Sequence, residues 1–250
     1  MNQIDLNGRV AVITGGAQGI GYAAAERMLK SGASVVLWDI DADRLAQAET
    51  ALSTLGKVKG QVVELTVEAD IEAATKDAMA LHGRIDILVN NAGATEIVAH
   101  DDLAGATPEI WRRLYDINVI APFVLVTAAE QALRAADGCV VNITSLAGVK
   151  QLGSSIPYAA SKAACNHQTR LLAKALGPGI RVNAVAPGLV DTPWTVGAYW
   201  DELRAVVVAL SPLRRSATPD DVAEAVLFLV RSSYVTGQVV EVDGGLGLLP

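Results

Sequence analysis

The sequence predicts an α/β protein built on a doubly wound parallel sheet with helices on both faces, a three-layer arrangement. Short apolar segments of strand length alternate with longer helical segments along the whole chain. Several of these segments end directly in glycine or polar residues, as strands do at the carboxyl edge of such a sheet. The chain has 250 residues, 51% hydrophobic and 19% charged, which is enough to bury one large core. We therefore expect about seven strands in a single domain spanning residues 1–250.

The first expected strand, residues 9–14, ends at a glycine cluster over residues 15–21, and a helix is expected over residues 22–31. Gly15, Gly19 and Gly21 let the backbone turn sharply and approach a ligand closely. Free amide groups at a helix start favour a phosphate. A glycine loop between a strand and a helix therefore indicates a nucleotide site.

The second expected strand, residues 33–38, is followed by Asp39. In a dinucleotide-binding unit of the Rossmann type, an acid about 20 residues beyond the glycine turn binds ribose hydroxyls and repels a 2′-phosphate. This interpretation favours NAD and disfavours NADP. The alternative is that Asp39 caps the helix expected over residues 42–55, a role we favour for Asp41. Positions 17, 18, 40 and 42, where a 2′-phosphate would want a basic residue, hold neither Arg nor Lys.

The rest of the chain continues the alternation. The further expected strands are residues 60–65, 85–89, 138–145, 180–186 and 238–242, and the further helices are 68–82, 108–135, about 158–176 and 219–230. Residues 90–93 end the fourth strand, and Asn90 either braces neighbouring backbone, which we favour, or touches a cofactor. Asn118 lies in a helical region, and its spacing assigns it no role. Residues 189–216 form a loop-and-helix insertion that we expect to act as a lid.

Tyr158 and Lys162 are four residues apart at the start of an Ala-rich helical run, so their side chains share one helical face. A fixed ammonium group favours the phenolate, and lowering a phenol pKa by about 3 units needs roughly 4 kcal/mol. The same spacing is also typical of an ordinary half-exposed helix. Ser145 ends the fifth strand, and strand ends and helix starts meet at one edge of a doubly wound sheet. Ser145, Tyr158 and Lys162 can therefore converge on a cofactor.

Composition excludes several classes of protein. The 20 Lys and Arg residues against 27 Asp and Glu give a net charge of −7 without a basic stripe, which argues against nucleic-acid binding. Uninterrupted apolar stretches are too short to span a bilayer, and the start of the chain lacks a secretory signal pattern. The two cysteines, Cys139 and Cys165, suggest core residues of a reduced cytoplasmic protein. The mean hydropathy of +0.34 is high, and we expect a subunit interface as well as a core.

The order and spacing of the motifs resemble those of the short-chain dehydrogenase/reductase family over essentially the whole chain. The motifs that carry the resemblance are residues 14–21, 90–93, Asn118, Ser145, 158–162, 187–192 and 235–237. The resemblance implies a seven-stranded parallel sheet, a bound nicotinamide dinucleotide and, usually, a homotetramer. It implies no bound metal.

The resemblance also assigns roles. Tyr158 would be the general acid in ketone reduction and the base in alcohol oxidation, with its pKa lowered by Lys162 and by the positive charge of the oxidised nicotinamide. Ser145 would hydrogen-bond the substrate oxygen, Lys162 would also hold the nicotinamide ribose, and Asn118 would hold a water in a proton relay. The cofactor would contact Gly15, Gln18, Gly19, Ile20, Gly21, Asp39, Glu64, Leu65, Asn91, Ala92, Gly93, Tyr158, Lys162, Pro187, Gly188, Val190 and Thr192. The substrate wall would comprise Thr95, Ala147, Gln151, Leu152, Gly188, Trp194 and the lid.

Some positions depart from the family pattern. Glu64 and Leu65 stand where an Asp commonly meets the adenine, and Ser216 stands where a Gly is frequent. The segment between residues 230 and 234 is shorter than usual. These changes put the adenine contacts and the lid hinge or subunit interface in doubt, and they leave the catalytic set intact.

The predicted function is hydride transfer between a nicotinamide cofactor, with NAD favoured, and a secondary alcohol or ketone. A 3-oxoacyl thioester reductase and a non-catalytic dinucleotide-binding regulator are the alternatives. Trp194, Tyr199 and Trp200 would close over an apolar or ring-shaped substrate, or else simply pack together. Arg214 and Arg215 could meet a carboxylate or an acyl-carrier phosphate, but we favour a solvated surface for both.

Overall fold

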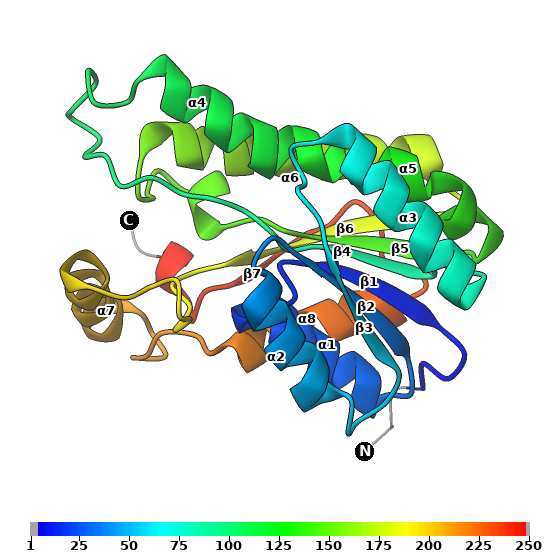
Figure 1. Ribbon diagram of the computed structural model, residues 1–250. Coiled ribbons are helices and arrows are strands. Elements are labelled where there is room, and N and C mark those ends of the chain that lie inside the picture. The colour runs from blue at the N-terminus through cyan, green and yellow to red at the C-terminus, as the bar shows by residue number, and fades with distance from the viewer. Residues whose placement is uncertain (1–4, 249–250) are drawn as a thin grey trace.

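The computed structural model describes residues 5–248 and contains one seven-stranded sheet in the order β3-β2-β1-β4-β5-β6-β7 (Figure 1). All neighbouring strands pair in parallel. The strands are β1 (Val10–Thr14), β2 (Ser34–Asp39), β3 (Val58–Val62), β4 (Ile87–Asn90), β5 (Cys139–Ile143), β6 (Arg181–Pro187) and β7 (Val239–Val242). The predicted doubly wound parallel sheet is confirmed.

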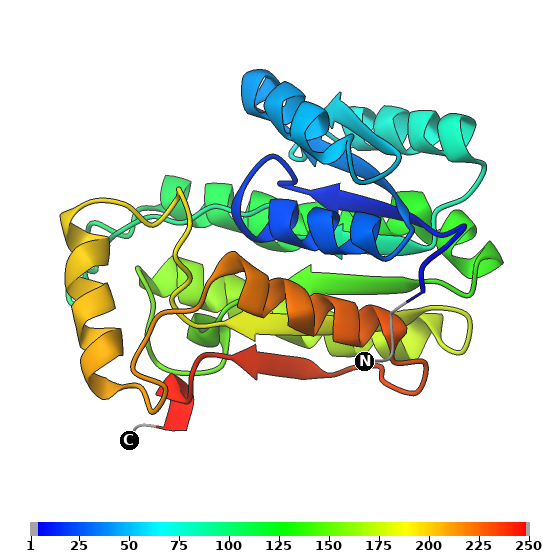
Figure 2. The ribbon, with the colours of Figure 1, turned by 90° about the horizontal axis from the view of Figure 1, so that it is seen from below.

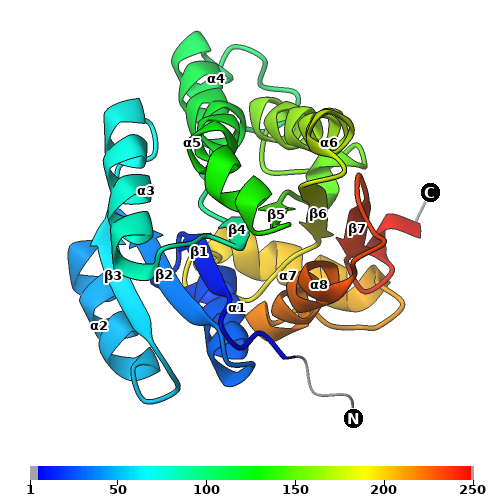
Figure 3. The same ribbon diagram turned by 90° about the vertical axis from the view of Figure 1, so that its right-hand side faces the viewer.

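Helices cover both faces of the sheet. The α-helices are α1 (Gly19–Lys30), α2 (Ala42–Leu52), α3 (Glu68–His82), α4 (Pro108–Tyr115), α5 (Ala121–Ala135), α6 (Ile156–Leu176), α7 (Ala198–Leu210) and α8 (Pro219–Arg231). Figure 3 shows α1, α2 and α8 on one side of the sheet and α3, α4, α5 and α6 on the other. Three short helical turns complete the chain: a π-helical turn η1 (Asp116–Ile120) and two 3₁₀ turns, η2 (Leu146–Gly148) and η3 (Leu246–Leu248).

Two hydrophobic cores separate the three layers, and the central strands contribute to both because successive side chains point to opposite faces. Ala11 and Ile13 of β1 pack into the core beneath α1, α2 and α8. Val12, between them, packs into the core beneath α3, α5 and α6. This double burial explains why the central strands read as continuous apolar runs.

The carboxyl ends of the strands all face the side of the molecule where α7 lies (Figure 2). Strand order reverses between β1 and β4, so the loops after these two strands diverge to opposite faces and leave a crevice. Ligands bind at such a switch point in doubly wound sheets. The glycine loop follows β1 and residues 91–93 follow β4, which brings both motifs to this crevice.

Several predicted boundaries differ from the structure: α1 begins at Gly19 and not at residue 22, and α2 ends at Leu52 and not at residue 55. The third strand was expected over residues 60–65, but β3 spans Val58–Val62 because Leu37 of β2 pairs with Gly60 and the ladder begins earlier. Val63, whose amide still donates to the Asp39 carbonyl at 3.0 Å, and Leu65 are buried beyond the last paired residue, so their apolar character reflects core packing. The helix expected over residues 108–135 is interrupted by η1, which separates α4 from α5.

By length and composition alone, the helical stretch Pro108–Ala135 could cross a membrane, which the sequence analysis did not anticipate. Leu125, Ala129 and Leu133 on α5 are buried in the core against the sheet, and core helices commonly satisfy the same criterion. Cys139 and Cys165 are both buried, as expected for core residues. Burial raises the pKa of the Cys139 thiol to about 11.

Candidate active site

The candidate catalytic side chains come from two consecutive segments at the carboxyl edge of the sheet. Ser145 follows β5 and begins η2, where its Oγ accepts a hydrogen bond from the Ala147 amide at 3.1 Å. Tyr158 lies in the first turn of α6, where its amide is bound by the Ser155 hydroxyl that caps the helix. Lys162 follows one turn later and is 6% exposed. The strand end and the helix start therefore bring all three to one place.

Lys162 is held over the end of β5. Its Nζ donates to the carbonyl oxygen of Ile143 at 3.1 Å and lies 5.9 Å from the centre of the Tyr158 ring. Burial lowers the pKa of Lys162, because the charged ammonium loses water. Burial likewise raises the pKa of Tyr158, and a hydrogen bond with the Ser145 hydroxyl opposes that rise. In the free protein the phenol is therefore protonated at neutral pH.

Asn118 lies behind this group in the π-helical turn η1. Its Oδ1 accepts from the Ala94 amide at 3.0 Å, and its Nδ2 donates to the Ala94 carbonyl at 2.9 Å and to the Ser161 hydroxyl at 3.0 Å. A β-carbon at Gly93 would stand 2.9 Å from Oδ1 of Asn118. Asn118 thus fastens the loop after β4 to helix α6, which is a contact that its spacing could not predict.

The glycine loop has the geometry of a phosphate site. Gly15 and Gly19 have φ values of +61° and +56°, which favour glycine. Gln18 is the N-cap of α1 and makes no side-chain capping bond, and the first turn of α1 holds no acidic residue. The amide groups at this helix start are therefore left to an anionic ligand. A β-carbon at Gly21 would collide with the Gly15 carbonyl, so Gly21 allows the tight packing of the loop.

The loop after β4 braces the glycine loop. The Nδ2 of Asn91 donates to the carbonyls of Thr14 and Gly15 at 2.9 and 3.0 Å, and the Thr14 hydroxyl accepts from the Asn91 and Ala92 amides. The Nδ2 of Asn90 donates to Oδ1 of Asn142 at 2.8 Å and to the Pro122 carbonyl at 3.4 Å, so Asn90 contacts neighbouring backbone, the role that we favoured. The two loops are thus rigidly joined at the switch point.

Asp39 ends β2 beside the glycine loop. Its Oδ2 accepts from the Ala17 amide at 3.0 Å and its Oδ1 from the Asp41 amide at 3.1 Å. Asp41, not Asp39, is the N-cap of α2, since its side chain accepts from the Arg44 amide. Of the two roles open to Asp39, helix capping is therefore excluded.

One large cavity, of about 1140 Å³, joins these groups. It is lined by all the predicted site residues except Gly21, which lies behind the glycine loop, and Asn118, which lies behind Gly93. The predicted residues in its wall are Gly15, Gln18, Gly19, Ile20, Asp39, Glu64, Leu65, Asn91, Ala92, Gly93, Thr95, Ser145, Ala147, Gln151, Leu152, Tyr158, Lys162, Pro187, Gly188, Val190, Thr192 and Trp194. The residues that line it suit an elongated dinucleotide. Asp39 lies at one end, the uncapped amide groups at the start of α1 lie in the middle, and Tyr158 with Lys162 lies at the other end.

Several wall residues were missed by sequence reasoning: Arg113, Lys150, Ser154 and Leu246. Lys150 and Ser154 lie on the loop between Ser145 and Tyr158, so their position between two candidate catalytic residues was a usable signal. Ser154 also shares a short hydrogen bond with the hydroxyl of Thr95. Arg113 and Leu246 reach the cavity only through the tertiary fold, which no local pattern in the sequence reveals.

The segment 189–216 covers one end of the cavity. Trp194 and Trp200 lie 6.3 Å apart, and Tyr199 meets Trp200 edge-on at 5.0 Å, with all three rings in the cavity wall. Arg214 and Arg215 are exposed and do not line the cavity, as favoured for a solvated surface. Arg215 instead pairs with Asp221 of α8.

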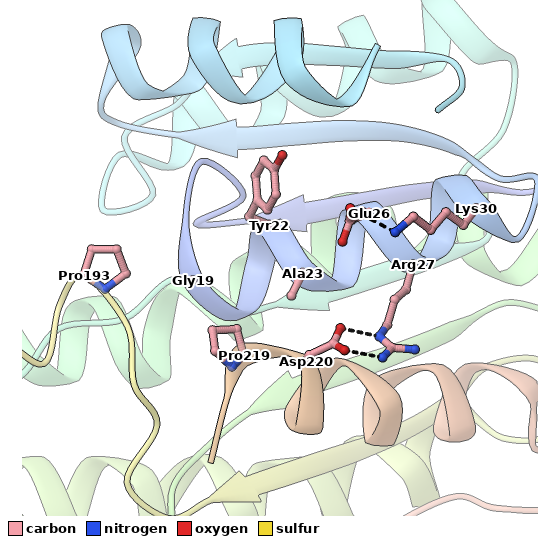
Figure 4. A pocket seen from close by; sticks show the side chains of 9 residues that line it. All are labelled: Gly19, Tyr22, Ala23, Glu26, Arg27, Lys30, Pro193, Pro219 and Asp220. Carbon is pink, nitrogen blue, oxygen red and sulfur yellow. Dashed lines mark hydrogen bonds and ion pairs between the residues drawn. The ribbon is translucent and has the colours of Figure 1, made fainter. Parts of the chain in front are cut away.

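A smaller hollow of about 470 Å³ lies on the outer side of the glycine loop (Figure 4). Its charged side chains pair with one another: Arg27 with Asp220, and Glu26 with Lys30. This hollow marks the junction of α1 with α8 and does not reach Tyr158. Within residues 5–248, no group of three or more His, Cys, Asp or Glu side chains is placed to hold a metal ion.

The fold and the site are those of a dinucleotide-dependent oxidoreductase, and comparisons with known proteins confirm this class. A family model described as enoyl-(acyl carrier protein) reductase matches residues 15–247. The chain belongs to the short-chain dehydrogenase/reductase family and is an NAD(P)-dependent oxidoreductase.

Relatives and solved structures match almost the full length. The chain is 45% identical over 242 residues to a Streptomyces violaceoruber protein named as ketoacyl reductase 2 of the granaticin polyketide synthase, covering 96% of both chains. It is 36% identical over 246 residues to a 3α-hydroxysteroid dehydrogenase of Mediterraneibacter gnavus, covering 96% of this chain and 98% of the relative. The structure of levodione reductase superposes with a TM-score of 0.90 at 29% identity, covering 98% and 99% of the two chains.

Proposed function

We propose that this protein transfers a hydride between a nicotinamide cofactor, preferably NAD, and a secondary alcohol or ketone. The observation that carries the proposal is the convergence of Ser145, Tyr158 and Lys162 at one end of a cavity whose other end holds Asp39. The glycine loop and the bare start of α1 lie between them and suit a diphosphate. When bound, the cofactor supplies the hydride donor or acceptor.

In ketone reduction, Ser145 and Tyr158 both direct hydroxyl groups at the substrate oxygen. Ser145 stabilises the developing negative charge by a hydrogen bond, and Tyr158 donates the proton. The raised pKa of Tyr158 keeps the phenol protonated at neutral pH, which is the form that a proton donor needs. In alcohol oxidation the phenolate is the base, and the nearby ammonium of Lys162 favours its formation.

Asn118 supports this arrangement. Both polar atoms of its side chain are bound to Ala94 and Ser161, so we assign the side chain to fixing the loop and helix that carry the site. The water relay that the family resemblance implies remains a prediction for this residue.

The substrate that we favour is a ring-shaped or apolar secondary alcohol or ketone. Trp194, Tyr199 and Trp200 all line the cavity, with the ring of Trp200 at 6.3 Å from that of Trp194 and 5.0 Å from that of Tyr199. Such rings bury apolar surface and pack well against planar or ring-shaped ligands. Levodione reductase and the 3α-hydroxysteroid dehydrogenase, both similar to this chain, are named for cyclic substrates.

A 3-oxoacyl thioester is the second candidate substrate. The similarity to a protein named as a ketoacyl reductase favours it. Asp39 argues for NAD and hence for oxidation, which weighs against this candidate. An assay at 340 nm with NAD and NADP against cyclic alcohols, polyols, hydroxy acids and 3-hydroxyacyl thioesters distinguishes the two, because only one class should be turned over efficiently.

Replacing Tyr158 by Phe tests the mechanism. We expect Tyr158→Phe to lower kcat at least about 100-fold, because the general acid and base is lost, while NAD binding measured by calorimetry stays within about twofold of wild type, a change of under 1 kcal/mol. Tyr234→Phe, at a fully exposed tyrosine, is the matched control. Activity unchanged in Tyr158→Phe would contradict the mechanism, and wild-type protein that binds NAD but turns over no substrate would favour a non-catalytic regulator.

A further inference from the structure

An arginine contacts a residue of the cavity wall near Asp39, from a helix that the sequence did not implicate. Gln18 lines the cavity, and its Oε1 accepts a hydrogen bond of 2.7 Å from Nη1 of Arg44. Arg44 lies in the first turn of α2 (Ala42–Leu52). Position 18 is one of those at which a 2′-phosphate would want a basic side chain. Position 18 is a glutamine instead, and it binds the guanidinium of Arg44 from α2.

Asp39 lies next to the same place. Its carboxylate is bound to the amide of Ala17, the residue before Gln18, and to the amide of Asp41. Asp41 in turn pairs with Nε of Arg44 at 3.2 Å. The carboxylate that repels a 2′-phosphate and the guanidinium that would attract one therefore bind adjacent residues, Ala17 and Gln18, of which Gln18 lines the cavity.

The Arg44 side chain can exchange its present partners for a ligand. It is 54% exposed and its partners are the exposed carboxylate of Asp41 and a neutral amide. Exposed pairs of this kind are weak, so a phosphate dianion can compete for the guanidinium. Charge-assisted bonds from arginine to phosphate are among the stronger polar contacts.

We propose that Arg44 determines how strongly the site discriminates against NADP. The inference rests on the proposed use of a nicotinamide dinucleotide. Asp39 makes NAD the preferred cofactor, and Arg44 offsets part of the repulsion that a 2′-phosphate meets there. NADP is therefore bound with a modest penalty and is not excluded. NAD gains nothing from Arg44, because its ribose hydroxyls carry no charge.

Calorimetric titration with NAD⁺ and NADP⁺ tests the proposal without any substrate. We expect Arg44→Gln to weaken NADP⁺ binding about fivefold to tenfold, where tenfold is about 1.4 kcal/mol, and to change the Kd for NAD⁺ less than about twofold. Arg231→Gln is the matched control, with the same charge change at an exposed residue at the far end of α8. It should change neither the Kd for NADP⁺ nor the Kd for NAD⁺. Added salt should reduce the effect of Arg44→Gln, because it screens exposed charges.

A double-mutant cycle separates Arg44 from Asp39. We expect Asp39→Asn to strengthen NADP⁺ binding and weaken NAD⁺ binding, and the double variant with Arg44→Gln to lose most of the gain for NADP⁺. An unchanged Kd for NADP⁺ on removal of Arg44 in both backgrounds would overturn the inference and leave the proposed function standing. Wild-type protein that binds neither dinucleotide would overturn both.

Discussion

At the scale of single residues, the buried pair Tyr158 and Lys162 carries the acid and base chemistry. In the free protein, burial favours the neutral form of each: it raises the pKa of Tyr158 and lowers that of Lys162. The Nζ of Lys162 is occupied by the Ile143 carbonyl. The neutral phenol of Tyr158 is therefore ready to donate a proton in ketone reduction. Alcohol oxidation requires conditions that stabilise the phenolate.

This pair predicts opposite pH dependence for the two directions of the reaction. Since the phenol must lose its proton to act as a base, alcohol oxidation should rise with pH, and ketone reduction should fall at alkaline pH. We expect Lys162→Met to move the rise in kcat for oxidation to higher pH by about 1–3 pH units, the effect of removing one close cation. The measurement is the pH profile of kcat at saturating cofactor.

The exposed Lys174 on the same helix provides the control for this experiment. Lys174→Met should leave both profiles in place. A Lys162→Met profile that matches wild type would show that Lys162 does not act on the phenol, whatever its effect on cofactor binding.

Sequence reasoning was most successful for residues whose role depends on local spacing. Tyr158 and Lys162 are one helical turn apart, and Ser145 lies two residues after the end of β5, so the topology of a parallel sheet was enough to bring them together. Arg44 and Leu246 could not be found in this way, because helix packing sets the contact of Arg44 with Gln18, and the path of the chain after β7 brings Leu246 to the cavity. Contacts of that kind leave no periodic trace in the sequence.

At the scale of elements, the residues at which helices and strands begin and end were harder to predict than whether a segment is a helix or a strand. The apolar run beyond residue 62 resembled strand but is core packing past the end of β3. The π-helical turn η1 is invisible to a 3.6-residue pattern, since one extra residue in the turn leaves the flanking helices intact. That turn is what places Asn118 against Ala94.

Helix α8 provides an element whose stability depends on one terminus. The Thr218 hydroxyl accepts from the Asp221 amide at 3.2 Å, and the Asp221 carboxylate accepts from the Thr218 amide at 2.7 Å, which is a capping box. Arg215, by hydrogen bonding to Asp221, holds the pKa of that carboxyl well below its usual range. We expect Thr218→Ala to lower the free energy of unfolding by about 1 kcal/mol, measured by urea denaturation.

A threonine in a helix interior gives the matched comparison. Thr50 is exposed on α2, where its hydroxyl bonds only to the Ala46 carbonyl. Thr50→Ala should be neutral or slightly stabilising, because alanine is the better helix former. Equal losses in both variants would contradict a specific contribution from the α8 cap.

At the scale of the whole molecule, helices α5 and α6 each expose a large apolar side chain although the core is complete. Phe123 on α5 is 48% exposed and Leu171 on α6 is 57% exposed, and the two helices lie side by side on one face of the sheet (Figure 3). Exposed apolar patches are typical of a surface that another protein covers.

We expect a second copy of this chain to cover that face, in keeping with the homo-oligomer predicted from the sequence. Leu171→Glu should then place a charge in the interface and reduce the molar mass measured by light scattering after gel filtration, because an unpaired buried charge strongly disfavours association. Val62→Glu, at an exposed residue on the edge strand β3, should leave the mass unchanged. A wild-type mass of one chain, or a Leu171→Glu mass equal to that of an oligomeric wild type, would show that α5 and α6 do not form the interface.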